Sequence, residues 1–433
     1  MTTTERCNEN RQLGDLAARA VVFIALPGAL LVALGILMTF KSDLTWERFL
    51  RGYVAAFCFV LTICLGGLFF TILQHLSRAG WSVAVRRVAE ALAANLRWIW
   101  ILFIPIAIGM YKTHLYEWTH VPPDDELLGN KEIFLNPTFW MIRAAFYFAV
   151  WGGLAHFFLR NSIAQDADGD PKTTLRMARV AAPAMIVYAL TQSFAVIDWV
   201  MSLEPKWFST MFGVYFFAAS CFGFLATLIL VCYLLQRSGR VTESITAEHY
   251  QDMGKFLFAF GVVFWAYIAY SQYMLIWYAD IPEETTWFIV RQLGGWRGLS
   301  ILLILGHFVG PFLLLLSRHP KRWTNVLPAI CVWMLFIHFI DMYWLVLPEY
   351  PAELVASVST YPQLIEAFEN GIDPATGIPW LARYDMHPHL ADACCLLGLA
   401  GIVLGLTGLS VRNASLIPIG DPRLPESLAF ENF

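Results

Sequence analysis

Residues 325–348 read NVLPAICVWMLFIHFIDMYWLVLP, an apolar run long enough to cross a bilayer, with one aspartate near its end. The aspartate is Asp341, and six residues separate it from Pro348. A second apolar run ends with the same Ile-Asp-x6-Pro pattern, from Asp198 to Pro205. A charged residue at the centre of a membrane helix costs about 2.5 to 3.5 kcal/mol on insertion scales. Two aspartates at matching positions therefore predict a duplicated unit that contains a polar site.

The rest of the chain has the composition of an integral membrane protein. Hydrophobic residues make up 58% of its 433 residues and charged residues 14%, and the mean hydropathy is +0.58. A soluble fold of this length cannot bury so much apolar surface. We therefore expect an all-α integral membrane protein, a single polytopic domain over residues 1–433. Its ten predicted spans are residues 18–40, 51–76, 97–115, 138–160, 178–201, 210–235, 254–279, 296–317, 325–347 and 389–411.

The distribution of charge predicts the topology. Lysines and arginines are concentrated in the two terminal segments and in the loops after spans two, four, six and eight. Positive residues stay in the cytoplasm, so both termini are expected there, with the first span retained rather than cleaved as a signal peptide. The stretch 349–388 is then an outer acidic loop. The net charge of −4 gives no indication of a nucleic acid partner.

Other matches recur in the same order as the two aspartates. Span two carries Tyr53 and Gln74 at the spacing that Tyr215 and Gln236 have in span six, and spans four and eight each contain a His-Phe pair. The order predicts two four-helix bundles in parallel orientation, made of spans two to five (residues 51–205) and six to nine (residues 210–348), with spans one and ten flanking them.

Several titratable residues are predicted at the level of the two aspartates, in the outer third of the bilayer. His338 lies three residues before Asp341, on the same helix face, and span ten begins with a second His-x-x-Asp, formed by His389 and Asp392. With Asp198 these residues are candidates for proton handling, because a carboxylate beside an imidazole accepts protons near neutral pH. The alternative is that each aspartate caps a helix or pairs with an arginine or histidine and only stabilises the bundle.

Further polar residues are predicted at successive depths in the membrane, where they could carry protons through ordered water or simply join helices. These proton-path candidates are Tyr188, Gln192, His156, Tyr267, Ser271, Gln272 and His307. Spacing alone leaves open a haem held by His156 and His307, although no span carries the repeated histidine pairs of a dihaem cytochrome b. The cysteines form no C-x-x-C pair or cluster-ligand run, so no metal site is expected.

Residues 194–215, FAVIDWVMSLEPKWFSTMFGVY, resemble the signature of the F subunit family of bacterial alternative complex III, within the superfamily of NrfD and polysulfide reductase membrane subunits. The resemblance implies the bacterial cytoplasmic membrane and a role in quinol:electron acceptor oxidoreduction, with menaquinol as donor. It also implies partners: a sister NrfD-like quinol-binding subunit, an iron–sulfur subunit, haem c subunits, small membrane subunits and a terminal oxidase. The redox cofactors belong to those partners, and only Asp198 among the candidates lies in the matched motif.

The sequence thus favours a membrane subunit that anchors extracytoplasmic redox subunits and contributes a proton pathway, and it leaves room for a quinone pocket. A purely structural scaffold is the alternative within the same complex. An unrelated secondary transporter also fits the repeats, but no pair of spans shows the Gly/Pro-interrupted centres expected of a substrate site.

Overall fold

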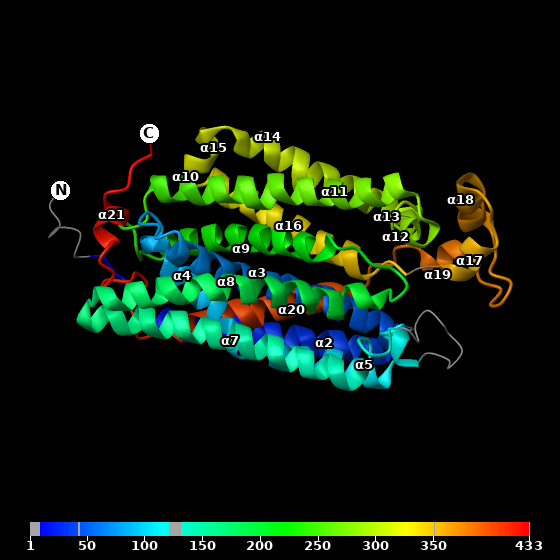
Figure 1. Ribbon diagram of the computed structural model, residues 1–433, viewed down its shortest axis with the longest axis horizontal. Helices are drawn as coiled ribbons and strands as arrows, with labels where there is room; N and C mark the ends of the chain where they lie inside the picture. Colours follow the sequence, from blue (N-terminus) through cyan, green and yellow to red (C-terminus); the bar gives the residue numbers. More distant parts are fainter. Residues whose placement is uncertain (1–8, 42–43, 121–130, 350, 433) are drawn as a thin grey trace.

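A computed structural model describes residues 9–41, 44–120, 131–349 and 351–432. Across these ranges ten helical segments are long and apolar enough to cross a membrane, which confirms the predicted all-α, multi-pass class. They run along the long axis of the molecule (Figure 1). The helices are α1 (Asp15–Ala20), α2 (Leu26–Lys41), α3 (Trp46–Leu76), α4 (Val83–Ala93), α5 (Trp100–Lys112), α7 (Pro137–Asp168), α8 (Pro171–Trp199), α9 (Phe212–Arg237), α10 (Ala247–Phe256), α11 (Phe264–Ala279), α12 (Pro282–Val290), α13 (Gly294–Leu303), α14 (Gly310–Leu316), α15 (Arg318–Arg322), α16 (Val326–Val346), α17 (Ala352–Ala356), α18 (Tyr361–Asn370), α19 (Trp380–Tyr384), α20 (Leu390–Thr407) and α21 (Leu424–Leu428).

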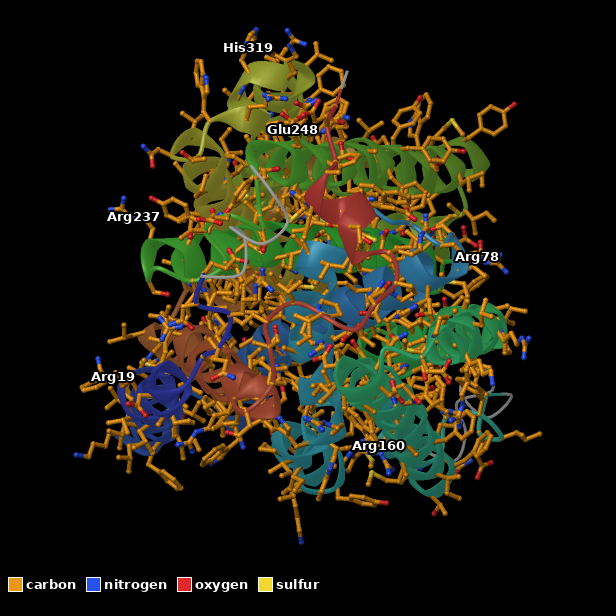
Figure 2. The ribbon with its side chains drawn as sticks, turned by 90° about the vertical axis from the view of Figure 1, so that its left-hand side faces the viewer. Arg19, Arg78, Arg160, Arg237, Glu248 and His319 are labelled. Carbon is orange, nitrogen blue, oxygen red and sulfur yellow. The ribbon has the colours of Figure 1, made fainter. Side chains whose placement is uncertain are left out.

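The first and the last described residues lie at one end of the bundle, which we call the terminal end; the opposite end, with α17, α18 and α19, is the loop end (Figure 1). The carbonyl of Asn10 accepts a hydrogen bond from the Val241 amide (3.1 Å), and the Asn432 amide donates to Glu248 (3.2 Å). Viewed from the terminal end, basic side chains such as Arg19, Arg78, Arg160 and Arg237 project around the perimeter (Figure 2).

Helices α3 and α9 occupy the centre of the bundle and pack against each other. In their most apolar stretches 89% of the α3 residues and 78% of the α9 residues are buried. The two helices approach closely at Gly66, where an added Cβ would lie 2.3 Å from the carbonyl oxygen of Ser220. Among the ten spans, the second and the sixth are thus the most enclosed.

The first and last spans, α2 and α20, pack against each other along a seam of small residues. A Cβ on Gly28 would lie 2.7 Å from the carbonyl oxygen of Gly398, and one on Gly405 would lie 2.6 Å from the Ala25 nitrogen. Small residues let two membrane helices approach each other in this way. Helix α20 also packs on α3, so this pair is attached to the centre of the bundle.

Helix α4 forms the first part of the third span, Val83–His120, and is buried along its whole length, although its charged residues lower its hydropathy. Arg86 Nε lies 3.3 Å from Glu90 Oε1, and Arg87 Nη1 lies 2.9 Å from Asp166 Oδ2. Arg86 also pairs with Asp421 of the C-terminal segment. Pairing of this kind is what makes buried charges tolerable.

The predicted outer loop 349–388 contains three short helices, α17, α18 and α19, which share a small apolar core. Leu354, Phe368 and Trp380 pack there with Leu293 from the turn before α13. Asp373 accepts hydrogen bonds from Thr376 (2.6 Å) and Arg383, which hold the turn before α19. The stretch is acidic, as predicted, but it is folded into a cap rather than a simple connection.

Candidate functional site

The carboxylate of Asp198 is fully buried near the loop end of α8 and is matched by an arginine. Arg143 of α7 donates from Nε to Oδ2 (2.8 Å) and from Nη2 to Oδ1 (2.7 Å), a bidentate geometry that is among the strongest hydrogen-bonded pairs. Tyr147 adds a third donor at 2.8 Å. The contacts of Asp198 therefore match the alternative interpretation of the sequence, in which the aspartate pairs with an arginine.

The rest of the DWVMSLEP motif builds the end of α8. The Asp198 carbonyl accepts from Trp140 Nε1 (2.8 Å) and from the Ser202 hydroxyl, which closes the last turn. Trp207 then stacks on Trp287 of α12, with ring centroids 4.5 Å apart. The motif thus joins the end of α8 to α7 and to the loops at this end.

Asp341 of α16 has surroundings of a different kind. It is fully buried, and its carboxylate accepts from the Tyr215 hydroxyl and from Trp265 Nε1 (3.1 Å). Both donors are neutral, and no lysine or arginine of the described ranges forms an ion pair with Asp341. A buried carboxylate without a cation is costly. The two aspartates of the repeated pattern therefore lie in chemically distinct sites.

His338 lies on the same helix as Asp341 and contacts α3. Its Nε2 is 2.8 Å from the Thr62 hydroxyl, which donates to the Phe59 carbonyl (2.7 Å). Since the hydroxyl proton is used there, Nε2 carries the imidazole proton and Nδ1, which has no partner, is a bare acceptor. The ring fits because residue 223 is glycine: a Cβ there would lie 2.6 Å from His338.

His307 is buried between two aromatic rings, and neither ring nitrogen has a hydrogen-bond partner. Its centroid lies 3.6 Å from that of Trp265, in a stacked arrangement, and 3.8 Å from that of Phe222. His307 belongs to a π-helical segment, residues 304–309, which contacts a second π-helical segment, residues 257–263. Such π-helical turns are frequent at functional sites. Trp265 links His307 to Asp341, since it stacks on one and donates to the other.

The second His-x-x-Asp forms the start of α20. Asp392 accepts from the His389 amide (3.1 Å), and His389 Nδ1 accepts from the Ala391 amide (3.1 Å), a reciprocal capping arrangement. Arg48 of α3 donates to both Asp392 oxygens, at 3.0 and 2.7 Å, and Tyr343 completes the cluster. Here too the structure places the pair in a cap and an ion pair, and among the described residues it shares no hydrogen-bond partner with Asp341.

The proton-path candidates are divided between the interior and the surface. Tyr188 and Gln272 are buried, and each has a side-chain oxygen without a hydrogen-bond partner, whereas Gln192 donates to the Gly213 carbonyl (3.1 Å). Tyr267 is 63% exposed on the face of α11 that points away from the bundle.

Two further candidates also have surface positions. Ser271 is half-buried and donates to the carbonyl of Tyr267 at 2.7 Å, one turn earlier on α11. His156 is exposed in a surface groove, whereas His307 is enclosed between two aromatic rings. The two histidines therefore lie in unrelated surroundings, and the arrangement does not favour one haem between them.

A cluster at the loop end contains Glu204, which sequence reasoning did not single out although it lies within the 194–215 motif. Burial raises the pKa of Glu204 to about 7, opposed by Arg51 and Arg291. Burial likewise lowers the pKa of Arg291 to about 9, with Glu204 and Tyr215 among its electrostatic neighbours. Arg291 donates to the Trp344 carbonyl (3.1 Å). The Arg51 side chain lies 3.1 Å from Glu349.

No protein-family model and no curated protein matches the chain. The structure itself defines a class: a multi-pass helical membrane protein in which one buried aspartate is paired with arginine and another has only neutral donors. No group of three or more potential metal ligands comes together among the residues that are described.

Proposed function

We propose that the chain is an F-type membrane subunit of alternative complex III, in the NrfD/polysulfide reductase superfamily. The support is local: the motif that carries the resemblance forms the Asp198 pair and the Glu204 cluster at one end of the bundle. In this proposal the loop end faces outward and the ring of basic residues at the terminal end faces the cytoplasm of a bacterium. Iron–sulfur and haem c subunits would dock at the loop end, beside a sister quinol-binding subunit that oxidises menaquinol.

Within such a complex, the group around Asp341 would handle protons. The observation that carries this part is that Asp341 is buried with only neutral donors, while its counterpart Asp198 is neutralised by Arg143. A carboxyl group in such a site can take up and release a proton, whereas one in a bidentate arginine pair is held ionised. The bare Nδ1 of His338 and the unprotonated ring nitrogen of His307 provide buried acceptors close by.

The route would lead from this group to the loop end. Tyr215 donates to Asp341, Arg291 is an electrostatic neighbour of both Tyr215 and Glu204, and Glu204 has a pKa near 7. A group that titrates near neutral pH is suited to releasing a proton to the outside. The same end would also provide any quinone pocket that this subunit contributes.

We also infer that residues 51–205 and 210–348 are copies of one four-helix unit. Their first helices, α3 and α9, both begin at the loop end and pack at the centre of the bundle. Asp198 and Asp341 each lie within the last two turns of a helix that ends at the loop end.

The scaffold alternative is favoured by Asp198 and Asp392, because each is paired with an arginine from a neighbouring helix. The scaffold hypothesis and the proton-handling hypothesis make different predictions for Asp341. In the assembled complex reconstituted into liposomes, Asp341→Asn should abolish or strongly reduce proton translocation while quinol oxidation continues, and Asp198→Asn should mainly lower the yield of assembled complex. Unchanged proton translocation in Asp341→Asn would leave the scaffold.

A further inference from the structure

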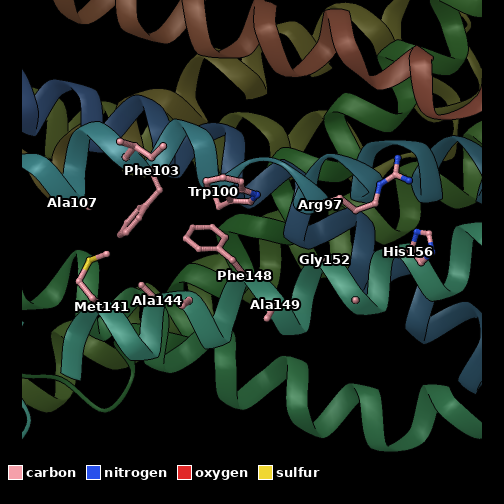
Figure 3. A pocket seen from close by; sticks show the side chains of 13 residues that line it. Arg97, Trp100, Phe103, Ala107, Met141, Ala144, Phe148, Ala149, Gly152 and His156 are labelled. Atoms are coloured by element: carbon pink, nitrogen blue, oxygen red, sulfur yellow. The ribbon is translucent and has the colours of Figure 1, made fainter. Parts of the chain in front are cut away.

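A surface groove of about 730 Å³ runs between α5 and α7 (Figure 3). Its floor on α7 contains five small residues beside Met141, Phe148 and His156, and its other wall is formed by apolar side chains of α5 such as Phe103 and Ile104. The small residues are Ala144, Ala145, Ala149, Gly152 and Gly153. From Met141 to His156 the groove follows α7 for about 23 Å, most of a hydrocarbon core of about 30 Å.

One end of the groove lies beside a break in the third span, which is not a continuous helix. Between α4 and α5 the chain forms a 3₁₀ turn, residues 94–97, and then leaves helical geometry at Trp98 (φ −131°). Helix α7 approaches this break closely: a Cβ on Gly152 would lie 3.3 Å from the Leu96 carbonyl oxygen. A Cβ on Gly153 would meet nothing within 4 Å, so the space beside it is open.

Positive charge is found at one end of the groove only. Arg97 and His156 lie together there, and Phe103, Ala107 and Met141 lie toward the other end (Figure 3). Arg97 is exposed; its Nε donates to the Ala94 carbonyl (2.9 Å), and no carboxylate in the described ranges is paired with its guanidinium. Arg97 directly precedes the apolar stretch of the third span, the position at which lipid headgroups meet the hydrocarbon core.

We propose that this groove binds an anionic phospholipid, with an acyl chain along α5 and α7 and the phosphate against Arg97 and His156. The apolar floor fits a chain, and a guanidinium without a carboxylate partner fits a phosphate, to which arginine can donate two parallel hydrogen bonds. The proposal of this lipid site requires only that the chain lies in a membrane. The site would exist whether or not the respiratory function proposed above is correct.

The test is lipid binding to the full chain, purified in detergent, stripped of lipid and titrated in native mass spectrometry with phosphatidylglycerol or phosphatidylcholine. The wild type should bind one phosphatidylglycerol molecule in preference to phosphatidylcholine. Arg97→Gln should weaken phosphatidylglycerol binding about tenfold, the loss expected for one charged hydrogen-bonding group. Arg97→Lys should retain most of it. Gly153→Leu, which fills the open space, should weaken both lipids.

Arg237→Gln is the matched control, because Arg237 is an exposed arginine at the terminal end that does not line the groove (Figure 2). Equal weakening by Arg237→Gln and Arg97→Gln would reduce the effect to general surface charge and overturn the proposal. So would equal binding of the two lipids by the wild type. Retention of a quinone instead, lost in Arg97→Gln and Gly153→Leu, would replace the phospholipid site by a quinone site.

Discussion

The pairing of Asp198 with Arg143 predicts a large loss of stability when the arginine alone is removed. In Arg143→Gln the buried carboxylate would keep one neutral side-chain donor, Tyr147 at 2.8 Å, in place of two charged hydrogen bonds. The pair is well enclosed, since the Arg143 side chain is 10% exposed and that of Asp198 is 0% exposed. Breaking a buried pair from one side costs about 3 to 5 kcal/mol. We expect a loss in that range in the free energy of unfolding, measured by SDS titration of the purified chain in mixed micelles.

The matched comparisons are Asp341→Asn and the double variant Arg143→Gln/Asp198→Asn. Asp341→Asn disturbs two neutral hydrogen bonds, each contributing about 0.5 to 1.5 kcal/mol, so it should lose clearly less than Arg143→Gln. The double variant should lose less than the sum of its single variants, with a coupling of at least about 2 kcal/mol. A loss below about 1 kcal/mol for Arg143→Gln, the range of solvent-exposed ion pairs, would refute the assignment of Asp198 to a structural pair.

Three further variants test other parts of the structure. Burial raises the pKa of Glu204 from 4.5 to about 7, so the folded state binds this proton more tightly than the unfolded state. The protonated group therefore stabilises the fold fully below about pH 4.5, and this contribution is lost as the pH rises toward 7. Glu204→Gln should flatten the fall in stability between about pH 5 and 8, and a profile parallel to that of the wild type would contradict this. Tyr215→Phe removes one of the two hydrogen-bond donors to Asp341 and should slow proton translocation by the assembled complex more than quinol oxidation. An equal effect on both rates would exclude a specific role of Tyr215 in proton transfer. Gly398→Leu should destabilise the chain by about 1 to 3 kcal/mol in SDS titration, because a Cβ there would lie 2.8 Å from the Gly28 carbonyl oxygen. Ala393→Leu, on the exposed face of α20, is the control and should change the stability little. Equal losses in the two variants would exclude close packing as the cause.

The membrane class and the ten spans were predictable because hydropathy depends on local sequence. Each predicted span overlaps a helical segment of the structure, and the main difference, α4, has a physical explanation. Its charges lower the hydropathy, yet Arg86 and Arg87 are neutralised by Glu90 and Asp166, and one partner, Asp421, comes from the far end of the chain. A hydropathy pattern contains no information about partners so distant in sequence.

The positions of the candidate residues along their helices were predictable from the sequence, whereas their contacts were not. Sequence placed Asp198 and Asp341 near the ends of their helices, but it could not tell that Arg143 reaches one and that only Tyr215 and Trp265 reach the other. The distinction depends on which faces α7, α9 and α11 turn toward the two aspartates, which tertiary packing sets.

Glu204, in contrast, was not predicted as a candidate residue. It was visible within the motif, but its raised pKa depends on how the loops at this end surround the half-buried side chain, which no local pattern indicates.

The differences between the two halves of the chain are consistent with a division of roles after a duplication. On the first half, Arg143 and Tyr147 of α7 fix the charge of Asp198, and such a pair favours a single rigid arrangement. On the second half, α13 and α14 are joined by a π-helical turn that presents His307 to Trp265, and Trp265 donates to Asp341. A buried carboxyl that lacks a cation lowers stability, and under the proposed function it is kept for a use that an arginine pair would prevent. Reversible protonation is such a use, because a bidentate arginine would favour the ionised form of the group.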